Sequence, residues 1–194
     1  MLSKLDQLEV LFNIVVENSA NSQLLSNFPD LINSLVQLHI CKIKEFISEQ
    51  NVQEAHEIRE YSGYCLSSVQ EYGNNKAQII LLNGGYAKSL SLNVALAGGL
   101  LETDTTEIVG SYSELGLLAR SIFQGRESDD EFKIPSLDPQ PFLIKEVEEQ
   151  IEEEGCFEEV DVWYYGEQFN EENSPGNYNI ENDLLNIYHN PTSK

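Results

Sequence analysis

Residues that could act as catalytic groups are scattered along this 194-residue chain. His56 is followed by Glu57 and Glu60, which places two carboxylates near one imidazole. The spacing differs from the HExxH pattern, in which two histidines one helical turn apart hold zinc. His39 and His189 stand far from this group in the sequence. Because no nucleophile, base and orienting group are matched, we expect no catalytic residues, no metal site and no enzyme activity.

The glycines and cysteines form no recognised binding motif. Asn83-Gly84-Gly85 and Gly98-Gly99 lack the GxGxxG and GxxxxGK[ST] patterns that bring backbone amides to phosphates. Cys41, Cys65 and Cys156 are widely spaced and include no CxxC pair, so the sequence indicates neither a zinc site nor a disulfide framework. We therefore expect no cofactor, and reduced thiols in the core or at the surface.

The charge of the chain is strongly acidic and uneven. There are 33 Asp and Glu against 11 Lys and Arg, for a net charge of -22, and residues 127–194 alone carry 19 of the acids. Such a chain repels phosphate backbones and anionic membranes and attracts basic proteins. No apolar run reaches the length that spans a bilayer, and no secretory signal is visible. We expect protein partners, no direct nucleic acid, no membrane, and a cytoplasmic or nuclear location.

Apolar residues recur at helical spacing through most of the chain. Leu5, Leu8, Leu11, Phe12 and Val15 place one apolar stripe on a helix over about residues 3–17. Similar patterns predict short helices near 23–25 and 77–82 and further helices through 31–38, 52–69, 90–96, 108–122, 142–151, 157–163 and 180–188, with Asn51 as an N-cap. No segment alternates as a strand does, so the sequence predicts an all-α fold.

The helical pattern repeats along the chain. A shift of 55 residues superposes Ile14 on Val69, Leu25 on Ile80 and, further on, Leu35 on Leu90. A unit of short helix, helix and long helix is typical of armadillo repeats, each of which buries its apolar face by stacking on its neighbours. We predict a right-handed armadillo/HEAT-like α-solenoid of about four short repeats. An irregular helical bundle is the alternative.

Prolines and acids predict the domain boundaries. Residues 1–126 form the repeats, and residues 127–141, with three prolines and several acids, form an insert that is a loop or partly disordered. Residues 142–190 form a final acidic capping repeat, whose first helix ends at Gly155, and residues 191–194 form a tail.

Three segments resemble importin-α, an armadillo-repeat family. Residues 8–15 (LEVLFNIV), followed by NSQ at 21–23 and PDLI at 29–32, look like the third helix of one repeat passing into the next. Residues 59–69 (REYSGYCLSSV) resemble the third-helix motif in which a tryptophan and an asparagine stand four residues apart. Residues 151–160 and 179–188, which follow an insert, are similar to the last repeat.

The resemblance implies a concave groove, lined by third helices, that binds an extended basic peptide. There an asparagine hydrogen-bonds the peptide backbone and an aromatic face receives cations. Glu9 and Tyr64 occupy the tryptophan positions of the motif. The predicted peptide-binding residues are Glu9, Asn13, Glu57, Glu60, Tyr64, Ser68 and Glu71. In the alternative interpretation, Glu57 and Glu60 are only solvated charges on a helix face.

The same resemblance implies a second surface near the C-terminal end, where the last repeats of importin-α contact a transport receptor. The predicted docking residues are Glu149, Glu152, Glu153, Trp163 and Tyr164. Alternatively, the glutamates cover a capping repeat and the aromatic residues pack in the core.

We interpret the chain as a non-enzymatic protein-binding module for an extended basic peptide or a karyopherin-like transport receptor. The alternatives are a structural scaffold subunit of a larger assembly, and an acidic inhibitor or decoy of a basic protein. An uncapped first helix would expose Leu5, Leu8 and Phe12, so we also expect an oligomer or a complex through that helix.

Overall fold

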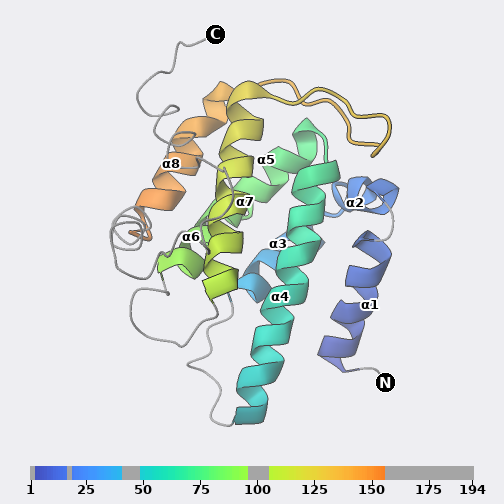
Figure 1. The fold of residues 1–194 in the computed structure, drawn as a ribbon, viewed down its shortest axis with the longest axis vertical. Helices are drawn as coiled ribbons and strands as arrows, with labels where there is room; N and C mark the ends of the chain where they lie inside the picture. Colours follow the sequence, from blue (N-terminus) through green and yellow to red (C-terminus); the bar gives the residue numbers. More distant parts are fainter. Residues whose placement is uncertain (1–2, 17–18, 41–48, 96–104, 156–194) are drawn as a thin grey trace. The chain divides into compact units, whose positions relative to one another are not determined.

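The described part of the chain is helical. The computed structural model describes residues 3–16, 19–40, 49–95 and 105–155, and within them it contains no strand. The elements are α1 (Lys4–Val16), α2 (Ser19–Leu25), α3 (Pro29–His39), α4 (Glu49–Tyr72), α5 (Asn75–Asn83), α6 (Tyr86–Ala95), α7 (Thr105–Gln124), the 3-10 helix η3 (Pro141–Leu143) and α8 (Ile144–Glu152) (Figure 1). The all-α prediction is therefore confirmed for these residues.

The chain divides into two compact units. The first contains Met1–Ser89 and Arg126–Asp138, and the second contains Leu90–Gly125 and Pro139–Lys194. In the first unit α4 packs against α1, α2 and α3. Its core consists of apolar side chains from these helices, among them Leu8, Val15, Ile32, Leu35, Val36, Cys65, Leu66 and Val69. Each large aliphatic side chain buried in this way stabilises the fold by about 1.5–3 kcal/mol.

Polar side chains close both ends of α1. Ser3 and Asp6 form a reciprocal cap, in which the Asp6 amide donates to Ser3 Oγ at 3.0 Å and the Ser3 amide donates to the Asp6 carboxylate at 2.9 Å. At the other end, Asn21 and Ser22 of α2 donate to the carbonyls of Ile14 and Val15 at 2.8 and 3.0 Å. The last carbonyls of a helix lack partners within it, so α2 satisfies part of the end of α1.

The segment Arg126–Asp138 folds as a hairpin that belongs to the first unit. Two antiparallel bridges join Arg126 to Leu137 and Asp129 to Ile134. At the tip, Asp129 Oδ1 accepts hydrogen bonds from the amides of Glu131 and Phe132, and Lys133 adopts a left-handed φ of 56°. The segment predicted as an insert thus forms a defined turn and takes part in two backbone bridges.

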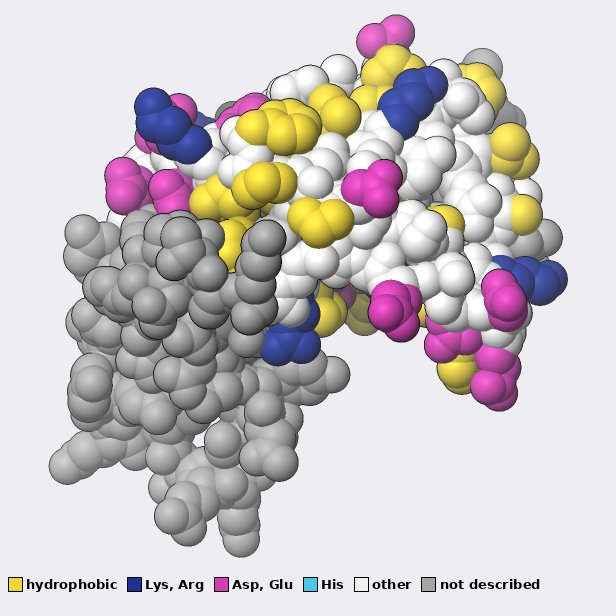
Figure 2. Space-filling model, turned by 90° about the horizontal axis from the view of Figure 1, so that it is seen from above, with side chains coloured by type: hydrophobic (Ala, Val, Ile, Leu, Met, Phe, Trp, Pro, Cys, Tyr) yellow, Lys and Arg dark blue, Asp and Glu magenta, His cyan; other side chains and the backbone are white. Residues whose placement is uncertain are grey.

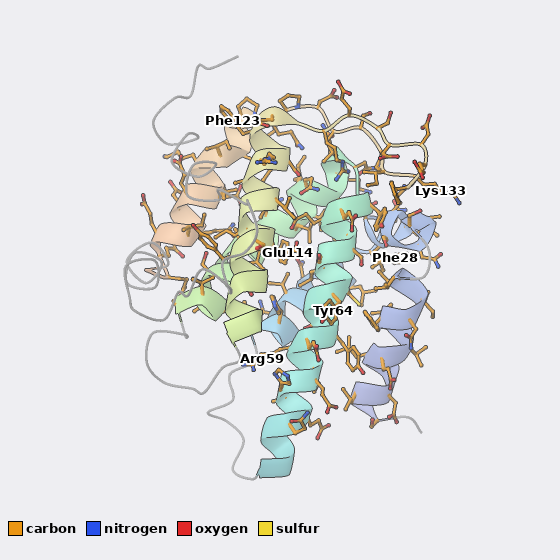
Figure 3. All side chains as sticks on the ribbon, in the orientation of Figure 1. Phe28, Arg59, Tyr64, Glu114, Phe123 and Lys133 are labelled. Atoms are coloured by element: carbon orange, nitrogen blue, oxygen red, sulfur yellow. The ribbon has the colours of Figure 1, made fainter. Side chains whose placement is uncertain are left out.

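The hairpin is attached to the helices of its unit at its tip and at its root. The tip lies beside α2, where Gln23 Nε2 donates to the Lys133 carbonyl at 3.4 Å (Figure 3). At the root, the Asp138 amide donates to Asn75 Oδ1 at 3.2 Å, and the Arg126 guanidinium donates to carbonyls near the end of α4.

The second unit joins α7 to η3 and α8. Buried Ala119 of α7 packs with Tyr112, Phe123 and Ile144. The Gln140 amide donates to the Ile122 carbonyl at 2.7 Å, which connects the start of η3 to α7. The apolar side chains Val147 and Ile151 bury one face of α8, as the predicted capping helix requires.

Several predicted helix boundaries agree with the structure, and one is wrong. α1 lies within the predicted range 3–17. Asn51, predicted to be an N-cap, lies inside α4, which is already helical at Glu49. The N-cap that the structure does show in this region is Asn74, whose Oδ1 accepts from the Ala77 amide. The predicted helices 157–163 and 180–188 lie outside the described residues.

Candidate functional site: an acidic aromatic surface on α1 and α4

The packing of α1 against α4 brings three aromatic rings together. Phe12 of α1 contacts Tyr61 and Tyr64 of α4, with ring centroids 5.3 and 5.5 Å apart and interplanar angles of 42° and 41°. Tilted pairs at this separation add about 0.5–1.5 kcal/mol each to the energy of burial. Because Phe12 is half-buried and Tyr64 is 49% exposed, the rings hold the two helices together and also reach solvent.

Carboxylates from both helices surround these rings. The pKa of Tyr61 is raised, first by desolvation and then by the negative charges of Glu9, Glu57 and Glu60. The Tyr64 hydroxyl donates to Glu60 Oε1 at 3.2 Å. The group formed by Glu9, Phe12, Glu57, Glu60, Tyr61 and Tyr64 is called the acidic aromatic surface below.

On α4, the acidic aromatic surface and the core lie on different sides of the helix. Arg59 and Tyr64 are five residues apart and leave the helix in different directions (Figure 3). Arg59 is only 6% exposed, so its charge lies among the core residues. The charged groups that shift the pKa of Tyr61 are all glutamates. The acidic aromatic surface therefore offers negative charge and ring faces, which together attract a lysine or arginine side chain.

Not every predicted groove residue belongs to this surface. Asn13 is exposed on α1, one helical turn after Glu9. Ser68 is 9% exposed and is buried on α4, so its hydroxyl is not displayed as the predicted groove requires. Glu71 is exposed near the end of α4, where it raises the pKa of Tyr72 after the larger effect of desolvation.

Two members of the surface were missing from the predicted groove. Phe12 was assigned to the apolar stripe of the first helix, and Tyr61 was not singled out. A signal was present, since Tyr61 stands four residues after Glu57 and therefore on the same side of a helix. That Phe12 meets both tyrosines depends on how α1 packs against α4, which the sequence pattern does not state.

The structure describes only part of the predicted docking surface. Glu149, Glu152 and Glu153 are exposed at the end of α8, and Glu149 forms an exposed ion pair with Lys145 at 3.3 Å. The pKa of Glu148 is raised by desolvation and by neighbouring glutamates. Trp163 and Tyr164 lie outside the described residues. The exposed glutamates suit a solvated capping face and a docking surface equally.

The oligomer or complex through the first helix stays a prediction, but two of its three apolar residues are packed within the chain. Leu8 is buried and Phe12 packs on tyrosines of α4, so these residues are used within the chain. The side chains that α1 exposes are instead Val10, Ile14 and Val16, each between 47% and 50% exposed.

Comparisons of the chain with protein-family models, with curated proteins and with solved structures found no match. The resemblance to importin-α therefore stays a prediction from the quoted segments.

The described residues also bear on metal binding, membrane insertion and thiol chemistry. No group of three or more His, Cys, Asp or Glu residues among them could hold a metal ion, and no described helix is long and apolar enough to cross a membrane. Cys65 is buried, and desolvation raises the pKa of its thiol to about 12, which keeps the sulfur protonated and unreactive. Cys41 and Cys156 lie outside the described residues.

Proposed function

We propose that this chain is a helical-repeat protein-binding module whose acidic aromatic surface binds a basic segment of a protein partner. The observation that carries the proposal is the contact of Phe12 from α1 with Tyr61 and Tyr64 from α4, beside the Glu60 carboxylate that accepts the Tyr64 hydroxyl. Glu9 on α1 and the glutamates Glu57 and Glu60 on α4 all add negative charge that raises the pKa of Tyr61. Phe12 and Tyr64 add ring faces beside this charge.

The ring geometry limits how a cation binds there. Centroids 5.3 and 5.5 Å apart belong to rings in contact, so no ammonium group fits between them. A lysine or arginine side chain meets the rings from the solvent side, with its charge toward Glu57 and Glu60. This mode suits a segment with several basic residues, since each exposed charge contact alone contributes less than about 1 kcal/mol.

The order of helix lengths supports an armadillo/HEAT-like repeat. Helices α2, α3 and α4 have 7, 11 and 24 residues, and α5, α6 and α7 have 9, 10 and 20. We propose that the two sets are successive units of a right-handed solenoid, as the resemblance to importin-α implies. A crystal structure tests this: stacking of equivalent helices would support it, and unrelated packing of the two sets would favour the irregular bundle.

The binding proposal is tested by calorimetry with a lysine-rich peptide at about 50 and 200 mM salt. We expect binding at both concentrations, weaker at the higher one because salt screens exposed charges. The double substitution E57Q/E60Q and, separately, Tyr64→Ala are expected to weaken binding severalfold. The control D130N/E131Q removes two exposed carboxylates from the hairpin tip of the same unit, and it is expected to bind as the unchanged chain does.

The alternatives give different results in the same experiment. A structural scaffold that has no peptide site shows no binding at either salt concentration. An acidic decoy binds through its net charge of -22, so E57Q/E60Q and D130N/E131Q weaken binding equally. Either result contradicts a site on α1 and α4.

A further inference from the structure

A serine of the hairpin differs from the other serines that precede acidic residues. Four serines in the described part of the chain are followed three residues later by a carboxylate, namely Ser3, Ser68, Ser111 and Ser128. Only Ser128 has carboxylates at all three following positions, Asp129, Asp130 and Glu131.

The surroundings of the other three hydroxyls make them poor sites for modification. Ser3 Oγ accepts the Asp6 amide in the cap of α1. Ser68 and Ser111 lie inside α4 and α7 and are 9% and 8% exposed. Ser128 is exposed and lies outside any helix, between the two bridges of the hairpin. The structure therefore selects one of the four.

The neighbours of Ser128 define the kind of enzyme that would recognise it. Glu127, Asp129, Asp130 and Glu131 are all exposed. Acidic side chains, magenta in Figure 2, lie on the face of the molecule drawn there. Arg126 is the nearest basic residue before Ser128, but its guanidinium donates to three carbonyls and is half-buried. A kinase that recognises an arginine before the serine therefore finds Arg126 already bonded. The accessible charges next to Ser128 are all negative.

The hairpin tip also opens at small cost. One bridge, with hydrogen bonds of 2.9 and 2.8 Å between the backbones of Asp129 and Ile134, and the turn bonds to Asp129 Oδ1 hold it. An enzyme that binds its substrate as an extended strand has to release only these bonds and the hydrogen bond from Gln23 Nε2 to the Lys133 carbonyl to reach Ser128. Exposed turns held by few hydrogen bonds belong to the least stable parts of a fold.

We propose that Ser128 is a phosphorylation site for a serine kinase whose substrate groove is lined by basic side chains. Ser128 Oγ attacks the γ-phosphorus of Mg·ATP. The new Oγ–P bond forms as the bond from that phosphorus to the β–γ bridging oxygen breaks, ADP leaves, and the hydroxyl proton passes to the catalytic base of the kinase. The product adds a charge of about -1.5 to -2 to the hairpin at neutral pH.

The experiment uses the full chain, Mg·ATP and a purified serine kinase selective for serines that precede carboxylates. Mass spectrometry is expected to find one phosphoryl group on the peptide that contains Ser128. Ser128→Ala is expected to abolish it. Ser136→Ala is the matched control, because Ser136 is exposed in the same hairpin but is followed by Leu137, and it is expected to leave phosphorylation unchanged.

A third variant tests the role of the acidic residues. D130N/E131Q keeps Ser128 and removes two of the charges that the kinase would contact, so the initial rate is expected to fall severalfold. The proposal is overturned if the phosphate lies on another residue, if Ser128→Ala keeps it, or if the folded chain stays unmodified while an isolated peptide of residues 120–140 is phosphorylated.

Discussion

Arg126 Nη2 donates to the carbonyl oxygen of Gly73 at 3.0 Å, which joins the root of the hairpin to the end of α4. The same guanidinium donates to Gln70 at 3.4 Å and to Pro135 at 3.1 Å. The last carbonyls of a helix lack partners within it, and positive charge is favourable at that end. Arg126 thus caps α4 from a segment more than fifty residues further along the chain.

Arg126→Ala is expected to lower the free energy of unfolding by about 2 kcal/mol. A hydrogen bond from a charged donor contributes about 1.5–3 kcal/mol when buried, and this guanidinium is only half-buried, so the three bonds together give less than their sum. Urea unfolding measures the loss. Arg126→Lys keeps the charge but cannot reach three carbonyls at once. We expect its free energy of unfolding to lie between those of Arg126→Ala and the unchanged chain. Equal stability of Arg126→Ala and the unchanged chain would show that the cap contributes nothing.

His39 of α3 is enclosed by residues of two other helices, α4 and α6. Its Nδ1 lies 3.1 Å from Ser89 Oγ, its ring centroid lies 6.5 Å from that of Tyr86, and its Nε2 would lie 3.1 Å from a Cβ atom added at Gly63. Burial and, secondarily, the charge of Arg59 lower its pKa to about 4. The imidazole is therefore neutral in the folded chain at physiological pH.

This lowered pKa makes the fold sensitive to mild acid. The unfolded chain binds a proton at His39 near pH 6.5, whereas the folded chain resists it down to about pH 4. The stability is fully present above pH 6.5 and is lost progressively as the pH falls toward 4. At about 1.4 kcal/mol per pH unit, we expect a loss of about 2 kcal/mol by pH 5. Denaturant unfolding at pH 7.5 and pH 5 measures it.

His39→Gln is the control for that experiment, because a glutamine can still bond Ser89 but does not titrate. Carboxylates elsewhere change stability with pH in both chains, so the difference between the two chains isolates His39. We expect the unchanged chain to lose about 2 kcal/mol more than His39→Gln between these pH values. The same pH dependence in both would contradict a buried neutral His39.

Asn74 starts α5 through its side chain. Its Oδ1 accepts from the Ala77 amide at 3.1 Å, and its backbone is extended, as an N-cap requires. We expect Asn74→Ala to cost about 1 kcal/mol of stability in urea unfolding, and Asn74→Asp, which keeps the acceptor, to cost much less. If both substitutions cost the same, the cap is not the source of the effect.

The sequence predicted most helices well because their apolar stripes are local signals. α1 and α5 lie close to the predicted ranges 3–17 and 77–82. The start of α4 was misplaced because Asn51 has the side chain of an N-cap, whereas the helix, which packs against α1 and α3, already begins at Glu49. Propensity at one residue is weaker than tertiary packing along a whole helix.

The hairpin and the acidic aromatic surface depend on contacts that local sequence patterns do not predict. Three prolines and several acids predicted a loop or partly disordered insert at residues 127–141, where the structure has a hairpin with two bridges. Arg126 was placed at the end of the repeats, but it caps the distant helix α4. Glu57, Glu60 and Tyr64 were predicted from one helix, but Phe12 joins them only through the packing of α1 on α4. Each missed feature is a contact between segments far apart in the sequence.

Two glycines give opposite expectations for the same substitution. A Cβ atom at Gly73 would lie 2.2 Å from the Val69 carbonyl oxygen and 2.5 Å from the Ala77 Cβ, so backbone has to move. Gly73→Ala is expected to destabilise the chain by about 1–3 kcal/mol, as overpacking does, and to disturb the Arg126 contact.

Gly110, inside α7, has nothing within 4 Å of an added Cβ. There alanine only improves helix propensity, so Gly110→Ala is expected to stabilise by about 0.5–1 kcal/mol. Urea unfolding of both variants measures the two signs, and a stabilising Gly73→Ala would contradict the close approach of α4 and α5 at this turn.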